Sequence, residues 1–353
     1  MRDPPGIGGR FRAFSDIRMD QETLRRTKDL LSRSQTVLLL THQRPDGDAL
    51  GSLLGLGHML RAAGKKAFPV LAEGMSSVFR YLPGSGEVRA ELPPAYDLSI
   101  LVDCADSERI SVPGGTPLRP PDILVDHHIT NGRFAALNLV DSSASATSEL
   151  LVDLAPDLGL PIPPEAAMCL LAGVVTDTLG FRTPNTGPHT LDVVLRLMQA
   201  GGSLPETVER SLHRRSFSAA RYWGAGLSRL EREGEIVWTS LTLADRRAAG
   251  YPGRDDADLV NILSSIDGHK VALIFIEQED GKIKISWRVG EGMDVTPLAI
   301  SFGGGGHPAA SGASVEGSLE DVARIVLART QEWLAAWHLK NKPPSGGITP
   351  AGS

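Results

Sequence analysis

The chain has 353 residues, 41% apolar and 22% charged, and its 36 Lys and Arg against 42 Asp and Glu give a formal net charge of −6. This length favours two domains. No apolar run approaches the roughly 18 residues of a membrane span, and the negative net charge argues against nonspecific binding of long nucleic acids. The N-terminus shows no secretory signal and the two cysteines show no disulfide framework, so we expect a cytoplasmic protein without membrane contact.

The first part of the chain predicts a βαβ unit. Apolar residues at helical spacing over 20–34 precede an apolar run at 37–40 that is typical of a buried parallel strand. An apolar, glycine-containing helix is predicted over 49–63, and a second strand over 67–71. The intervening segment 41–52 carries a histidine and two aspartates.

Three predicted strands are followed by acidic or imidazole side chains. Runs at 98–102 and 123–125 repeat the pattern of 37–40. The side chains that follow these runs are His42, Asp46, Asp48, Asp103, Asp126, His127 and His128. Because open α/β sheets bind ligands at the carboxyl ends of their strands, we expect these groups to converge.

The remainder of the first domain is predicted to be helical. Helices are expected over 144–154, 165–176 and 189–200, with Asp177 directly after the second. A charged helical stretch follows from 206 to 231. We therefore place a parallel-sheet α/β domain at 20–210 and a helical linker at 211–235.

The pattern changes to alternating strands after residue 235, which predicts a smaller α+β domain over 236–337. Its expected strands are 236–241, 271–277, 282–289 and 313–315, with helices over 256–265 and 319–337. The run Gly303 to His307 lies between the third and fourth of these strands. Its glycines permit close backbone approach and favour binding of a phosphate or base, although glycine runs also serve as flexible connectors.

The convergent groups are typical of a divalent metal site. Carboxylates suit hard ions, and added imidazole favours Mn²⁺ or a later ion over Mg²⁺ or Ca²⁺. Each piece has a structural alternative: Asp46-Gly47-Asp48 as a turn, His42 as a hydrogen-bonded loop residue, and Asp103 or Asp177 as helix caps. Four segments that deliver such groups together favour a pair of ions, which serves attack by water on phosphorus.

These residues resemble the motifs of the DHH superfamily of phosphoesterases. The matching segments, in order, are Pro45 to Ser52, Val102-Asp103, Asp126-His127-His128 and Thr176-Asp177-Thr178. The second domain resembles the DHHA1 substrate-binding domain through Gly303 to His307 and Ser286-Trp287-Arg288. The chain is most similar to the branch of short oligoribonucleases and pAp phosphatases (NrnA-type).

The resemblance implies roles for individual residues. It assigns one ion to His42, Asp46 and Asp103, and a second ion to Asp48, Asp103, His127 and Asp177. It implies two Mn²⁺ ions, with Mg²⁺ as the alternative. His128 would donate to the scissile phosphate or leaving group, and Asp126 would orient an imidazole.

Substrate-binding residues are expected in the second domain. They are Arg288, Gly304, Gly305, Gly306 and His307. Two departures from the pattern of relatives concern Leu179, where many relatives have glycine, and the segment after Pro308, which lacks a basic residue.

The resulting hypothesis is a two-metal phosphodiesterase that degrades short single-stranded oligonucleotides and can act on 3′-phosphoadenosine 5′-phosphate (pAp). A homodimer is also compatible with the resemblance. One alternative substrate is a cyclic or linear dinucleotide; inorganic pyrophosphate is disfavoured by the glycine-rich loop. A catalytically silent nucleotide sensor predicts loss of a metal ligand, whereas every ligand position is filled.

Overall fold

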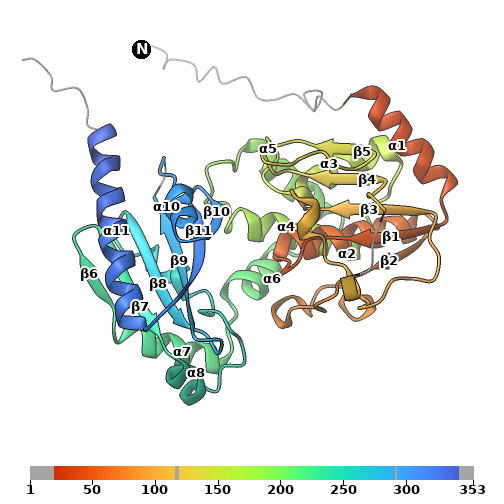
Figure 1. The fold of residues 1–353 in the computed structure, drawn as a ribbon. Coiled ribbons are helices and arrows are strands. Elements are labelled where there is room, and N and C mark those ends of the chain that lie inside the picture. Colours follow the sequence, from red (N-terminus) through yellow and green to blue (C-terminus); the bar gives the residue numbers. More distant parts are fainter. Residues whose placement is uncertain (1–19, 116–118, 291, 342–353) are drawn as a thin grey trace, which may run out of the picture. The chain divides into compact units, whose positions relative to one another are not determined.

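The computed structural model describes residues 20–115, 119–290 and 292–341 (Figure 1). The chain divides into two compact units, Met1–Arg214 and Arg215–Ser353. Within the described ranges, no helix is both long enough and apolar enough to cross a membrane.

The first unit contains a parallel five-stranded sheet with the strand order β2-β1-β3-β4-β5, which confirms the predicted α/β class. Its strands are β1 (Thr36–Leu40), β2 (Lys66–Pro69), β3 (Leu98–Val102), β4 (Ile123–Asp126) and β5 (Leu137–Val140). The central strands β1, β3 and β4 are almost fully buried, as their continuous apolar runs indicated. The edge strand β5 was not predicted, because only alternate residues of this short segment are buried.

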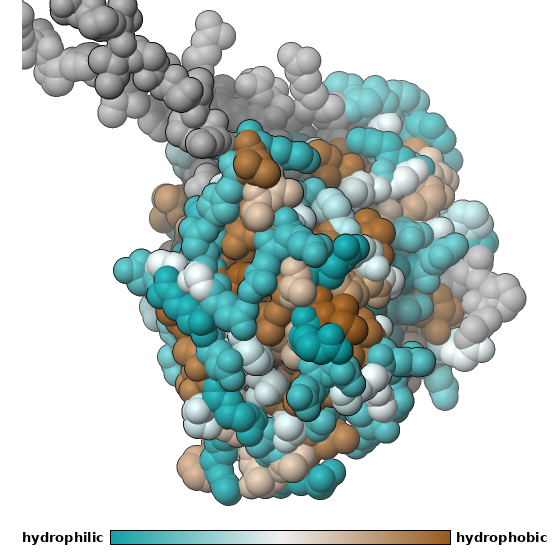
Figure 2. Space-filling view, turned by 60° about the vertical axis from the view of Figure 1, so that its left-hand side comes forward, coloured by the Kyte–Doolittle hydropathy of each residue, from teal (hydrophilic) through white to brown (hydrophobic). Residues whose placement is uncertain are grey.

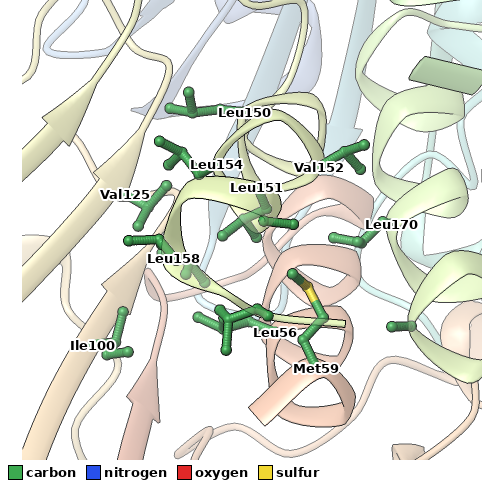
Figure 3. Packing of buried hydrophobic residues seen from close by; sticks show 14 of the residues in the cluster. Leu56, Met59, Ile100, Val125, Leu150, Leu151, Val152, Leu154, Leu158 and Leu170 are labelled. Carbon is green, nitrogen blue, oxygen red and sulfur yellow. The ribbon is translucent and has the colours of Figure 1, made fainter. Parts of the chain in front are cut away.

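Helices cover the sheet of the first unit. They are α1 (Gln21–Arg33), α2 (Gly47–Ala62), α3 (Thr147–Leu158), α4 (Pro164–Asp177), α5 (Pro188–Gln199) and α6 (Leu204–Val208), followed by a π-helix at Glu209–His213. Short 3-10 turns lie at Ser77–Phe79, Ser85–Glu87, Ser107–Arg109 and Pro113–Gly115. Figure 3 shows apolar side chains of α2, α3, α4, β3 and β4 meeting in one core. This core fixes the helices relative to the strand ends.

Helices α2 and α4 approach unusually closely because glycines line one face of α2. A Cβ atom added at Gly47 would lie 2.4 Å from the Thr176 side chain, and one at Gly51 would lie 2.5 Å from the Cys169 carbonyl oxygen. The spacing of four residues puts both glycines on the same side of the helix. The close approach brings the start of α2 to the end of α4.

The second unit contains a mixed six-stranded sheet with the order β10-β11-β9-β8-β7-β6. Its strands are β6 (Glu231–Glu233), β7 (Ile236–Leu241), β8 (Val271–Glu277), β9 (Lys282–Val289), β10 (Gly305–His307) and β11 (Ala310–Glu316). Its helices are α7 (Phe217–Leu227), α8 (Leu243–Ala249), α9 (Leu259–Leu263), α10 (Thr296–Ser301) and α11 (Leu319–Lys340). Strands β7, β8 and β9 have the predicted bounds.

Helix α7 lies in the segment that the sequence assigned to a linker. In the structure it packs against α8 and β7 and belongs to the second unit, which begins at Arg215. Figure 2 shows one face of the molecule, on which hydrophilic residues are interspersed with smaller groups of hydrophobic ones. Scattered exposed apolar side chains of this kind are ordinary on a folded surface.

Candidate metal centre

The loop after β1 and the first turn of α2 present His42, Asp46 and Asp48. Asp46 is the N-cap of α2, and its Oδ1 accepts hydrogen bonds from the backbone N–H groups of Asp48 (3.1 Å) and Ala49 (3.0 Å). His42 Nδ1 lies 2.8 Å from the carbonyl oxygen of Gln43, a contact that places the hydrogen on Nδ1. The lone pair of His42 is then on Nε2, which lies 3.7 Å from Asp103 Oδ2.

Asp103 follows β3 directly and occupies the centre of the cluster. It is 2% exposed, and its φ of 55° is in the left-handed region that a non-glycine residue rarely adopts. Its backbone N–H donates to the Val125 carbonyl (2.9 Å), and its Oδ1 accepts a hydrogen bond from Thr147 Oγ1 (2.9 Å). Strained backbone that persists in a buried, hydrogen-bonded position is typical of functional sites.

The end of β4 presents Asp126, His127 and His128. Asp126 Oδ1 accepts from the backbone N–H of His127 (2.9 Å) and from His128 Nδ1 (2.7 Å), while Oδ2 accepts from Asn131 Nδ2 (2.5 Å). Burial raises the pKa of Asp126, but these hydrogen bonds outweigh burial, and its pKa lies below the ordinary value. The same bond outweighs burial at His128 and raises its pKa. Asp126 therefore orients His128 rather than His127.

His127 and Asp177 complete the cluster. His127 Nε2 lies 3.6 Å from Asp177 Oδ2 and 3.8 Å from Asp103 Oδ1. Asp177 is the last residue of α4, so the close packing of α2 and α4 is what brings it near Asp48. The sequence-predicted metal ligands thus come together from five elements of the first unit.

Three groups of possible metal ligands share members. They are His42, Asp46 and Asp103; Asp48, His127 and Asp177; and Asp103, His127 and His128, each with ligand atoms within 4.8 Å of one another. Ligands about 2.0–2.2 Å from one ion lie within roughly 4.4 Å of one another, so these spacings approach those of a metal site. Asp103 belongs to two of the groups and His127 to two.

The charges of the cluster also fit cations. Burial, and next the charges of Asp48 and Asp46, hold the pKa of Asp103 well above its ordinary value. Burial also raises the pKa of Asp48, and burial with the charge of Asp48 raises the pKa of Asp177 to about 8. Buried carboxylates that lie close together repel one another when ionised, and divalent cations stabilise their ionised form. The residues present therefore fit a metal centre.

Two residues beside the cluster were missed in the sequence. Thr147, the first residue of α3, donates its hydroxyl to Asp103 and its backbone N–H to Asp48 Oδ2 (2.6 Å). Arg109 places NH2 3.5 Å from His42 Nδ1, and the Arg109 carbonyl accepts from the backbone N–H of Gln43 (2.6 Å). Neither belongs to a metal-ligand pattern; the available signals were a threonine at a helix start and an arginine near a strand-end aspartate.

A further group of possible ligands, Glu149, Asp153 and His189, lies between α3 and α5. Asp153 already accepts hydrogen bonds from His189 Nε2 (2.6 Å) and Arg196 NH1 (3.0 Å). The guanidinium supplies the positive charge that a metal ion would bring, so this group is a helix-to-helix contact.

Arg288 of β9 lies in the second unit and is well partnered by neutral groups. Its Nε donates to Asn261 Oδ1 (3.1 Å) and its NH1 to the Trp287 carbonyl (3.0 Å). Among the described residues, no carboxylate lies within 4.0 Å of this guanidinium. A partly buried, oriented arginine of this kind suits a phosphate.

The glycine-rich run forms a hairpin rather than an open loop. Gly305 to His307 pair as β10 with β11, and Arg288 and the His307 backbone both pair with Ala310. The His307 side chain lies outside the described part of the structure. The sheet register therefore places Arg288 on β9 and the predicted binding run on β10, the two strands that flank β11.

The glycines of this hairpin are not equivalent. A Cβ atom at Gly304 would lie 2.0 Å from the Gly312 carbonyl oxygen, and one at Gly306, whose φ is 145°, would lie 2.6 Å from the Ala310 oxygen. A Cβ atom at Gly305 would have no atom within 4 Å. Gly304 and Gly306 are required by the close strands, whereas Gly305 is not.

Comparison with known proteins identifies two matching domain models. The model described as DHH family, N-terminal domain, matches residues 36–174, and the DHHA1 domain matches residues 247–336. Both matches fall within the two structural units.

Two similar proteins carry the same name. A bifunctional oligoribonuclease and PAP phosphatase NrnA from Thermus thermophilus is 35% identical over 86% of this chain and 92% of that protein. The protein of the same name from Bacillus subtilis is 31% identical over 84% of this chain and 94% of its own length. A solved structure of an exopolyphosphatase-related protein from Bacteroides fragilis, 25% identical, superposes with a TM-score of 0.82 over 90% of this chain and 98% of that one.

Proposed function

The chain belongs to the DHH phosphoesterase family, and from this premise we propose that it hydrolyses short oligonucleotides to mononucleotides and removes a phosphate from pAp. The observation that carries the proposal is the cluster centred on Asp103, in which groups of carboxylates and imidazoles share members. The names of its relatives from Thermus thermophilus and Bacillus subtilis favour these two substrates over pyrophosphate.

His42, Asp46 and Asp103 would hold one divalent ion, and Asp48, Asp103, His127 and Asp177 would hold a second. The mixture of carboxylates with imidazole favours Mn²⁺, with Mg²⁺ as the alternative. Bound together, two such ions neutralise charge on a phosphoryl group and lower the pKa of water.

His128 would act on the substrate through its Nε2 atom. Nδ1 is engaged by Asp126, which fixes the ring and raises the pKa of His128. When the ring is protonated, Nε2 also carries a hydrogen, which would donate to a phosphate oxygen or to the leaving oxygen of the substrate. Asn131 Nδ2 donates to Oδ2 of Asp126 and so helps to hold the Asp126 carboxylate that orients His128.

Cationic groups would bind the phosphates of the substrate. In the first unit, Arg109 is exposed beside His42, and among the described residues no carboxylate lies within 4.0 Å of its guanidinium. In the second unit, Arg288 and Gly304 to His307 provide an oriented guanidinium and an open glycine position. When ionised, the five acidic side chains of the cluster match or exceed the charge of two divalent ions, so an anionic substrate needs such cations.

The test is an assay of the purified full chain with Mn²⁺. End-labelled di- to pentaribonucleotides, pAp, a cyclic dinucleotide and pyrophosphate are incubated separately, and the products are resolved by chromatography. We expect mononucleotides from the short oligonucleotides and AMP from pAp, with loss of both activities in EDTA. Turnover of pyrophosphate alone, or of the cyclic dinucleotide alone, would contradict the proposal. Light scattering of the same preparation tests the expected homodimer.

A further inference from the structure

The amino-terminal turn of α3 contacts two of the proposed metal ligands at once. The Thr147 hydroxyl donates to Asp103 Oδ1 (2.9 Å), and the Thr147 backbone N–H donates to Asp48 Oδ2 (2.6 Å). The backbone N–H of Ser148 donates to Asp48 Oδ1 (3.0 Å). All of these residues are at most 2% exposed, so water does not compete for the bonds.

The two carboxylates are held in different ways. Asp48 accepts a backbone N–H on each oxygen, as an anion does at a helix N-terminus, and the positive end of the helix dipole favours its ionised form. Asp103 accepts only the Thr147 hydroxyl from this helix. The hydroxyl is therefore the one side-chain group of α3 that sets the orientation of the Asp103 carboxylate.

Thr147 is fixed by its surroundings. A Cβ atom at Gly173 of α4 would lie 2.0 Å from Ser148 Oγ and 2.5 Å from Asp48 Oδ1, so α4 closes over this turn without a gap. Ser52 of α2 and Ser148 share a hydrogen bond of 2.9 Å. A shift of this turn would break these contacts, which hold Thr147 beside Asp103.

We propose that Thr147 is a positioning residue that orients the Asp103 carboxylate toward the imidazoles of both proposed ligand sets, with Oδ2 3.7 Å from His42 Nε2 and Oδ1 3.8 Å from His127 Nε2. The hydrogen bond occupies one lone pair of Oδ1 and directs the remaining lone pairs toward the cluster. Hydrogen bonds of this kind to a ligating carboxylate typically change metal affinity by 10- to 100-fold when removed. The proposal rests on the proposed metal centre.

The decisive variant is Thr147→Val, which keeps the shape and the backbone N–H to Asp48 and removes only the hydroxyl. We expect Mn²⁺ affinity, measured by calorimetry on the metal-free full chain, to fall about 10- to 100-fold. Thr147→Ser keeps the hydroxyl and should bind Mn²⁺ close to the parent. The matched control is Thr27→Val, since Thr27 is equally buried in the first unit but donates to the Thr23 carbonyl (2.8 Å).

The outcomes separate this inference from the proposed function. Unchanged Mn²⁺ affinity in Thr147→Val would overturn the positioning role while leaving the metal centre intact. A parent protein that binds no Mn²⁺ would overturn both. Should Thr147→Val fail to fold, the pair Thr147→Ser and Thr147→Ala isolates the hydroxyl, and equal Mn²⁺ affinity in the two would overturn the inference. Electron paramagnetic resonance of bound Mn²⁺ should change in Thr147→Val and not in Thr27→Val.

Discussion

Residues of the cluster in the first unit serve both the fold and the proposed chemistry. In the glycine hairpin of the second unit, different residues serve these two purposes. In the cluster, Asp46 is both a helix cap and a proposed ligand, and Asp48 both anchors α3 and faces the same site. In the hairpin, Gly304 is required by close backbone contact, while the neighbouring Gly305 is not. In the first unit, single residues both stabilise the fold and belong to the proposed site, whereas in the second unit separate residues do so. Mutations should therefore have mixed effects in the first unit and separable effects in the second.

The largest effect is expected for Asp103→Asn. Loss of the shared carboxylate should lower turnover of short oligonucleotides by about 10²- to 10³-fold or more. Removing one of several buried, mutually repelling carboxylates should leave the metal-free fold at least as stable, because the pKa of Asp103 is raised by burial and by Asp48. Activity assays and thermal unfolding in EDTA check the two parts. A lower melting temperature of the metal-free variant would contradict the burial and mutual repulsion on which the stability expectation rests.

The hairpin allows a direct test of separable roles. Gly304→Ala places a Cβ atom on the Gly312 carbonyl and should destabilise the protein by about 1–3 kcal/mol. Gly305→Ala meets no atom within 4 Å and should leave stability unchanged, while its methyl group at the proposed binding surface raises KM about tenfold. Chemical denaturation and steady-state kinetics on both variants give the comparison. Unchanged KM in Gly305→Ala would remove the glycine run from the substrate-binding residues.

Arg109 tests whether the first unit also contains a residue with a purely substrate-facing role. Arg109→Gln should raise KM about five- to tenfold for pAp, because a charge-assisted contact to phosphate is lost. Mn²⁺ affinity should be unchanged, since Nε2 of His42 and not Nδ1 faces Asp103. Arg119→Gln is the matched control: it removes the same charge from a surface ion pair with Asp122 (3.0 Å) before β4. Equal KM values in the two variants would contradict a substrate contact at Arg109.

The sequence predicted the strand bounds well where consecutive residues of a strand are all buried or where buried and exposed residues strictly alternate. The bounds of β3, β7, β8 and β9 agree with the structure because their apolar patterns are unambiguous. The short elements β5, β6, α8 and α10 were missed because each has few residues and few buried ones. The glycine run appeared as a loop because glycine has low strand propensity, and only pairing with β11 makes it a strand.

The sequence predicted which residues form the site but not which neighbouring residues hold them in position. Strand-end positions and spacing indicated which carboxylates and imidazoles would converge, and the structure brings them together. A threonine at a helix start did not by itself indicate a contact with Asp103, since this contact joins residues 44 positions apart and depends on how α3 packs. The closeness of α2 and α4 likewise depends on glycines whose role appears only when the two helices face each other.

The smallest predicted effect concerns Leu179, beside the cluster. Its φ is 49°, in the left-handed region that favours glycine. Leu179→Gly removes a strain of about 1–2 kcal/mol but adds freedom to the unfolded chain, so a gain of about 0.5 kcal/mol is expected. Leu195→Gly, at similar exposure (52% against 42%) but within α5, should instead lose about 1 kcal/mol. Denaturation of both variants checks the opposite signs. Leu179 lies only two residues after Asp177, so the variant also tests whether stability and turnover can be changed separately near the cluster. Higher stability with an unchanged kcat would show that they can. A lower kcat would show that substitutions in this loop, like those in the cluster, change both stability and turnover.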